Sequence, residues 1–219
     1  TSFADLEANK EKVNGKIVVW NVPFTKYGET VGYRYRGPSA AAKHGAIASL
    51  VRSIGPYGLQ TPHTGGMGYE EGVAKIPAAA ITMEDAMLMQ RMQDRGQPIE
   101  LELYMEAHFE PDAESRNVII EIQGSELPNE VVVMGGHIDC WDLGTGAMDD
   151  GSGCFVTWHA LNHLKKLGRA PKRTIRVCFW TNEENGLKGG EKYSELTTGE
   201  THVLAMEVDG GTFRPKGFS

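Results

Sequence analysis

The chain has 219 residues, of which 40% are hydrophobic and 23% charged, a composition typical of a globular protein. No apolar run approaches the roughly 20 residues of a membrane-spanning helix, and the net charge of −7 argues against a nucleic-acid partner. We therefore expect neither a membrane span nor nucleic-acid binding. The three cysteines form no CxxC pair, which excludes both a cysteine zinc site and a disulfide framework.

The first hundred residues predict a small mixed α/β unit. Strands are expected where apolar and β-branched residues cluster, and helices where Ala-rich or capped segments occur. The predicted strands are Lys16–Trp20, Ile76–Ile81 and Ile99–Tyr104, the predicted helices are Ser39–Ser53 and Thr82–Arg95, and the predicted loops are Asn21–Pro38 and Ile54–Gly72. The polar, proline-containing segment Ala107–Arg116 predicts a boundary between two domains, 1–106 and 107–219.

The second half alternates strands with helices, which indicates an α/β domain with a largely parallel sheet. The predicted strands are Asn117–Ile122, Val131–Gly135, Thr174–Trp180 and His202–Val208, and the predicted helices are Gly151–Leu167 and Glu184–Leu196.

Polar side chains follow three of these strands at the point where each strand ends. The first is followed by His137 and Asp139, the second by Glu183 and Glu184, and the third by Asp209. Open parallel sheets gather functional groups at the carboxyl ends of their strands, so these side chains are expected at one edge. Asp149 and Asp150 precede the glycine-rich start of a helix, and their loop can reach the same edge.

Carboxylates crowded at one edge repel one another unless a cation neutralises them. No Lys or Arg occurs anywhere from Asn117 to Leu164, so the sequence offers no local basic partner. One His among several carboxylates suits a single zinc ion or a carboxylate-bridged pair, whereas all-oxygen ligation would indicate calcium or magnesium. Each motif alone has an ordinary structural explanation, such as a helix cap or a turn residue. Their joint occurrence in one α/β domain favours a metal site.

Three motifs carry a resemblance to a known family. The segments HIDCWDLGTGAMDDGSG, WTNEENGLKGGEKY and MEVDGGTF, between His137 and Phe213, resemble the M28 family of co-catalytic zinc peptidases. The segments KIVVWN and IPAAAIT near the start resemble a protease-associated (PA) domain. The resemblance implies a PA-like α/β domain followed by part of a phosphorylase/hydrolase-like zinc exopeptidase domain with a mixed, largely parallel sheet.

The resemblance also implies roles for individual residues. It makes His137 and Asp209 ligands of one zinc ion, Asp149 the bridge between two ions, and Glu184 a ligand of the second ion. Glu183 would be the general base. Two further features follow the same pattern: Asp139 would orient the His137 ring, and a cis peptide bond would follow Asp149.

The family pattern places one more His ligand downstream of Asp209. No His follows Asp209 in this sequence. We therefore expect the second zinc site to lack its His in this chain, and to be weak or completed by water or by another chain.

The function implied is a two-zinc exopeptidase or dipeptidase, of carboxypeptidase or aminopeptidase type, that hydrolyses small peptides. One alternative is a single-zinc aminoacyltransferase resembling glutaminyl cyclase, against which the PA-like segment argues. Another is a non-catalytic binding module. The expected partners are a small peptide substrate and either a second copy or a downstream chain of the same protein, and the expected location is secreted or lysosomal.

Overall fold

A computed structural model describes residues 1–214 and 217. The chain divides into two compact units, Thr1–Glu110 and Pro111–Ser219, here called the N-terminal and C-terminal units. A search of the described residues finds no helix with the length and apolarity that crossing a membrane requires.

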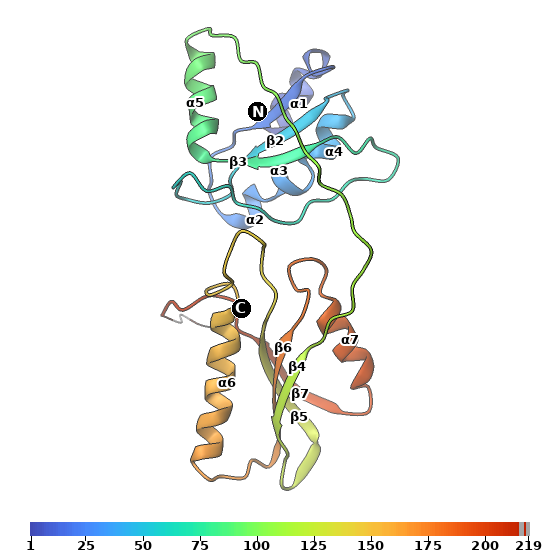
Figure 1. The fold of residues 1–219 in the computed structure, drawn as a ribbon, viewed down its shortest axis with the longest axis vertical. Helices are drawn as coiled ribbons and strands as arrows, with labels where there is room; N and C mark the ends of the chain where they lie inside the picture. Colours follow the sequence, from blue (N-terminus) through green and yellow to red (C-terminus); the bar gives the residue numbers. More distant parts are fainter. Residues whose placement is uncertain (215–216, 218–219) are drawn as a thin grey trace. The chain divides into compact units, whose positions relative to one another are not determined.

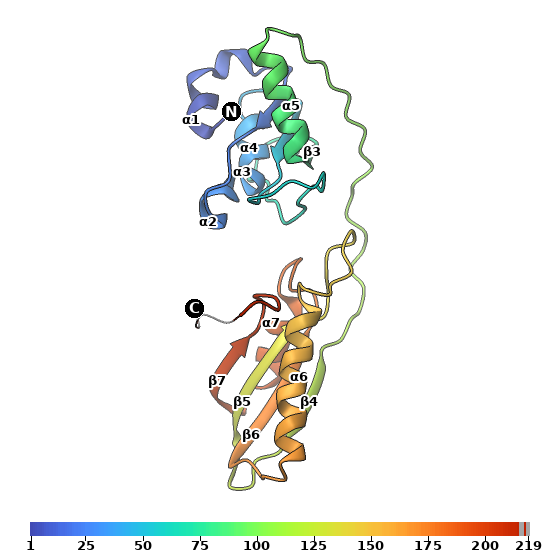
Figure 2. The same cartoon turned by 90° about the vertical axis from the view of Figure 1, so that its left-hand side faces the viewer.

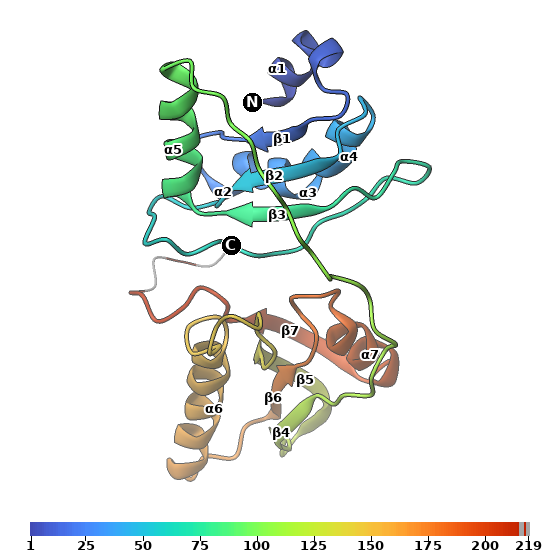
Figure 3. The same ribbon diagram turned by 45° about the horizontal axis from the view of Figure 1, so that its top comes forward.

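The N-terminal unit is built on a three-stranded parallel sheet in the order β1-β2-β3 (Figure 3). Short helices precede β1 and lie between β1 and β2, and a longer helix follows β3. The elements are α1 Phe3–Ala8, a 3₁₀ turn Lys10–Lys12, β1 Ile17–Trp20, α2 Tyr27–Thr30, α3 Gly32–Tyr35, α4 Gly37–Ala42, β2 Ala48–Arg52, β3 Ala78–Ile81 and α5 Met83–Asp94.

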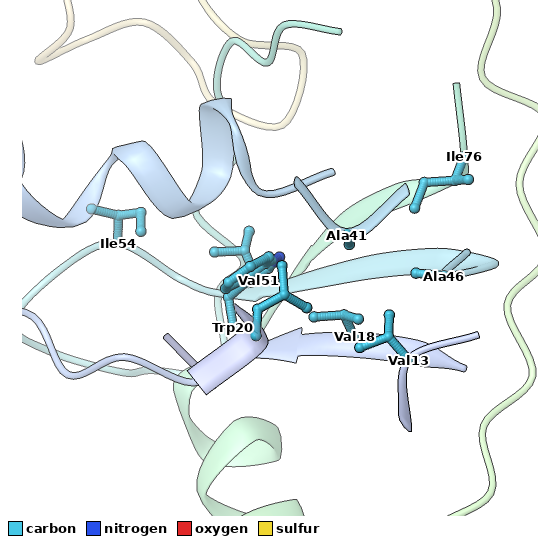
Figure 4. Close-up of a cluster of buried hydrophobic side chains, with 9 residues drawn as sticks. Val13, Val18, Trp20, Ala41, Ala46, Val51, Ile54 and Ile76 are labelled. Atoms are coloured by element: carbon cyan, nitrogen blue, oxygen red, sulfur yellow. The ribbon is translucent and has the colours of Figure 1, made fainter. Parts of the chain in front are cut away.

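Trp20 lies at the centre of this unit's core (Figure 4). It is fully buried, and its indole Nε1 donates a hydrogen bond to Ser49 Oγ at 2.9 Å. Phe3 and Tyr33 pack on the indole, with ring centroids 4.9 and 5.7 Å from it. The core therefore joins β1 to the helices that precede and follow it. Its buried apolar residues are Leu6, Val13, Val18, Trp20, Ala41, Ala46, Val51, Ile54 and Ile76.

The prediction of one helix over Ser39–Ser53 was wrong, because α4 ends at Ala42 and Ala48–Arg52 forms the central strand β2. Gly45, with φ +81°, breaks the helical path. The first four residues of β2 are buried. Such a short apolar run looks the same in sequence whether it is a buried helix or a two-sided buried strand.

Two further expectations differ from the structure. The predicted strand Ile99–Tyr104 has no regular secondary structure, since alternation of apolar and acidic residues makes a strand only where a partner strand pairs with it. The predicted loop Asn21–Pro38 contains α2, α3 and the start of α4. The helix after Thr82 is confirmed, with Thr82 Oγ1 accepting a hydrogen bond from the Asp85 amide at 3.0 Å.

The C-terminal unit holds a four-stranded sheet in the order β4-β6-β5-β7. β5 pairs in parallel with β6 and β7, and β4 pairs antiparallel with β6. Helices α6 and α7 lie on opposite sides of the sheet (Figures 1 and 2). The elements are β4 Val118–Ile122, β5 Leu127–His137, α6 Gly151–Lys166, β6 Arg173–Trp180, α7 Lys188–Leu196 and β7 Thr201–Glu207.

This sheet confirms the predicted α/β class with a mixed, largely parallel sheet. The predicted helix Glu184–Leu196 begins later than expected, at Lys188. The residues before it form a turn in which Asn182 and Leu187 have φ +62° and +60°. This turn carries Glu183 and Glu184 outside any helix. The assignment of the N-terminal unit to the PA domains stays a prediction.

Candidate metal centre

The site lies where β5, β6 and β7 end. His137 is the last residue of β5, Glu183 and Glu184 follow β6, and Asp209 follows β7. The three strands are parallel neighbours with β5 in the middle, so their carboxyl ends meet at one edge of the sheet. The loop between β5 and α6 brings Asp149 to the same edge.

His137 is the centre of this group. Its side chain is 1% exposed, and its Nε2 lies 3.0 Å from Asp149 Oδ1, 3.5 Å from Asp209 Oδ1 and 3.9 Å from Glu183 Oε2. Ligand atoms of His137, Asp149 and Asp209 all lie within 4.8 Å of one another. The carboxylate of Glu184 lies outside this group of three, although it is close enough to Asp149 for the two charges to interact.

The other ring nitrogen fixes the tautomer of His137. Nδ1 lies 2.8 Å from the backbone carbonyl oxygen of Asp139, which can only accept, so Nδ1 carries the proton. Nε2 then turns a lone pair toward carboxylates, and among the described residues this buried atom has no hydrogen-bond partner. A lone pair aimed at two anions is unfavourable unless a proton or a cation lies between them.

The ionisation of these groups shows the same conflict. Burial lowers the pKa of His137, but the hydrogen bond to Asp139 and the charges of Asp150, Asp209 and Glu183 outweigh it, so the pKa lies above its usual value. Burial and the charge of Asp149 raise the pKa of Asp209. Neighbouring anions favour the protonated forms, and a divalent cation would reverse this. One His nitrogen and two carboxylates at this spacing fit zinc.

Glu183 is partly buried beside this group. Burial raises its pKa, and the carboxylates of Asp209, Asp139 and Asp149 raise it further, against the opposing effect of His137. A carboxyl whose pKa is raised binds a proton more readily than an ordinary glutamate does.

Asp150 supports the site without being one of the three candidate ligands. Its fully buried carboxylate caps α6 by accepting from the Gly153 amide at 3.0 Å, and it also accepts from the His137 amide at 3.0 Å. The peptide bond between Asp149 and Asp150 is cis, as the resemblance implied. Asp150 therefore ties the end of β5 to the start of α6.

Sequence reasoning gave no role to two acidic residues near the site. The first is Asp150, whose cap on α6 was foreseeable but whose bond to His137 was not. The second is Glu207, whose pKa is raised by burial and by the charges of Glu183 and Asp209. The only signal for Glu207 was its place at the end of a strand that leads to a predicted ligand.

A comparison with protein-family models matches residues 117–218 to "Peptidase family M28". These residues are the segment that carries every member of the site. Residues 117–218 belong to peptidase family M28.

Curated relatives and solved structures agree with this assignment. The chain is 50% identical to carboxypeptidase Q of Xenopus laevis over 99% of its length and 48% identical to human carboxypeptidase Q over 99%. It covers 47% and 46% of those proteins, so it spans about half the length of the curated relatives it matches.

The crystal structure of a peptidase M28 precursor from Shewanella amazonensis matches with a TM-score of 0.89 and 39% identity. The match covers 96% of this chain and 50% of the Shewanella chain. A zinc aminopeptidase from Bacillus subtilis, BSAP, matches over 95% of this chain and 46% of its own with a TM-score of 0.56 and 21% identity, which shows a shared fold alone.

Proposed function

We propose that this protein is a zinc-dependent peptidase of the two-zinc type that hydrolyses the terminal peptide bond of small peptides. The observation that carries the proposal is the buried Nε2 of His137, aimed at Asp149 and Asp209 with Glu183 alongside, in a segment of family M28. Zinc bound there would supply Lewis acidity that lowers the pKa of water toward ~7 and polarises the scissile carbonyl.

The residues divide into ligands and a proton carrier. His137, Asp149 and Asp209 would hold one ion, and Asp149 with Glu184 would contribute to a second, whose His ligand the family pattern places downstream of Asp209. Glu183 would take a proton from the attacking water and deliver it to the leaving amine, because its carboxylate lies beside His137 but is not one of the three candidate ligands.

The type of exopeptidase is the finer part of the proposal. The relatives that are 48% and 50% identical to this chain over 219 aligned residues are named carboxypeptidase Q, which favours removal of a C-terminal residue. A probable leucine aminopeptidase of Aspergillus fumigatus is 35% identical over 153 residues. Removal of an N-terminal residue is therefore the other outcome that the test must distinguish. The secreted or lysosomal location, the second copy and the PA-like role of the N-terminal unit stay predictions.

The test separates metal binding from catalysis. Glu183→Gln should remove hydrolysis of a dipeptide panel while zinc content, measured by atomic emission, stays that of the unaltered protein. A matched Glu191→Gln change on the exposed side of α7, where the Glu191 carboxylate pairs with Lys188, should leave both unchanged. Zinc absent from a folded sample would contradict the site, and full turnover in Glu183→Gln would contradict the base. Dipeptides blocked at one end decide between carboxypeptidase and aminopeptidase.

A further inference from the structure

The side chain of Asp139 connects the ends of two strands. Its Oδ1 accepts a hydrogen bond from the Glu183 amide at 2.9 Å, and its Oδ2 accepts one from the Glu184 amide at 3.2 Å. Each carboxylate oxygen thus holds one backbone N–H of the adjacent pair that contains the expected base and a ligand. Hydrogen bonds of amides to an ionised acceptor are among the stronger ones in proteins.

The turn that carries this pair is also held by its own backbone and by Asn117, whose Oδ1 accepts a hydrogen bond from the Thr181 amide at 3.0 Å. The Leu187 amide donates to the Asn182 carbonyl at 2.7 Å, and the Gly186 amide to the Glu183 carbonyl at 3.4 Å. These bonds close the far side of the turn. The amides of Glu183 and Glu184, on the near side, are the ones that Asp139 accepts. The position of the Glu183–Glu184 backbone therefore depends on the Asp139 carboxylate, while the Glu184 side chain is also hydrogen-bonded to Trp141.

The His137 ring is held by a different atom of the same residue. The backbone carbonyl of Asp139 lies 2.8 Å from Nδ1, whereas the nearer carboxylate oxygen lies 3.8 Å away. The role that the resemblance implied for Asp139, orientation of the His137 ring, thus falls to its main-chain carbonyl. The carboxylate is free to act on Glu183 and Glu184.

We propose that Asp139 is a positioning residue that fixes the Glu183–Glu184 backbone, and through it the distance of the base and the second ligand from His137. This inference rests on the proposed function for its catalytic consequence, but the hydrogen bonds can be tested without zinc or substrate. Asparagine cannot replace the residue, because it offers one acceptor oxygen where two N–H groups need one each, and its NH₂ would face the second N–H.

The experiment compares Asp139→Asn with Asp142→Asn, an isosteric change of an exposed aspartate in the same loop. In metal-free protein, ¹⁵N NMR of Asp139→Asn should show at least tenfold faster hydrogen exchange at one or both of the Glu183 and Glu184 amides. The ¹⁵N shifts of the His137 ring should stay unchanged. Asp142→Asn should alter neither.

The same variants give two consequences for the loaded enzyme. Loss of a residue that orients metal ligands from outside the ligand set lowers metal affinity by about 10–100-fold, which is the decrease expected in a zinc titration of Asp139→Asn. A displacement of the base by about 1 Å costs on the order of 100-fold in rate. We therefore expect kcat to fall by about that factor while KM stays close to its original value.

Two results would overturn the inference. One is a change in the ¹⁵N shifts of the His137 ring in Asp139→Asn while hydrogen exchange at the Glu183 and Glu184 amides stays unchanged. This would mean that the Asp139 carboxylate orients the His137 ring. The other is exchange of these two amides in the unaltered protein as fast as in an open loop, a measurement that needs no variant to fold. Protein that binds no zinc but keeps both amides protected would refute the proposed function and leave the hydrogen-bond assignment standing.

Discussion

Two glycines at the third position of a helix give a matched test of how α6 is packed against the metal site. Gly153 is the third residue of α6, and Gly190 is the third residue of α7. A Cβ added at Gly153 would lie 1.8 Å from the Val208 carbonyl oxygen and 2.5 Å from both carboxylate oxygens of Asp150. A Cβ added at Gly190 would meet nothing within 4 Å. The same change to Ala should therefore lower the free energy of unfolding at Gly153 and raise it at Gly190.

The magnitudes follow from two competing effects. Replacing a helical Gly by Ala stabilises the helix by roughly 0.5–1 kcal/mol, and this is the full effect expected at Gly190. At Gly153 the contact is with backbone, so α6 and the residue that follows β7 must separate by about 1.5 Å to restore van der Waals distance. Overpacking of this kind costs about 1–3 kcal/mol. We expect Gly153→Ala to lower the free energy of unfolding by about 1–2 kcal/mol.

The separation also reaches the metal ligands. Val208 directly precedes Asp209, and Asp150 holds the His137 amide. Displacing both alters the 3.5 Å distance between His137 Nε2 and Asp209 Oδ1, so zinc affinity should fall with stability.

Urea denaturation of both variants with and without zinc, and a zinc titration of each, measure the two effects. A Gly153→Ala protein as stable as the unaltered one, with equal zinc affinity, would refute the packing of α6 against Val208.

The other predictions concern the core of the N-terminal unit and the pH dependence of the C-terminal unit. Trp20→Ala should destabilise the N-terminal unit by about 3–5 kcal/mol, because it empties a fully buried site and removes the donor to Ser49. Near-UV circular dichroism during a urea titration measures this loss of stability. A loss below about 1 kcal/mol would contradict the central place of Trp20 in the core. Hydrogen bonds from the buried Arg176 lower the pKa of Glu200 below its usual value. The stabilisation is therefore present above about pH 4.3, the pKa of an unfolded glutamate, and is lost as the pH falls through the folded pKa. The Glu200→Gln protein should have a lower free energy of unfolding than the unaltered protein at neutral pH, and should lose less of it on acidification. Urea midpoints of the two proteins that change in parallel from pH 6 to pH 3 would contradict this.

The sequence alone predicted the elements whose signals are local. Thr82 caps the predicted helix that follows it through a side chain that bonds to the amide three residues on, and such a bond depends on neighbouring residues only. The run from Arg173 to Trp180 is a strand in the structure because β-branched and aromatic residues fill it. The grouping of His137 with Asp209 was also predictable, since strand ends in a parallel sheet share an edge.

The tertiary structure decided what depends on partners distant in sequence. Ala48–Arg52 became a strand because β1 and β3 pair with it on both sides, and Ile99–Tyr104 did not, because its alternating pattern has no paired neighbour in the described structure. The Asp139 carboxylate bonds to amides 44 and 45 residues away. Its carbonyl, rather than its carboxylate, holds the His137 ring. Residue type and spacing set which side chains can reach one edge of a sheet, but hydrogen-bond partners are chosen by distances that exist only after the strands have assembled.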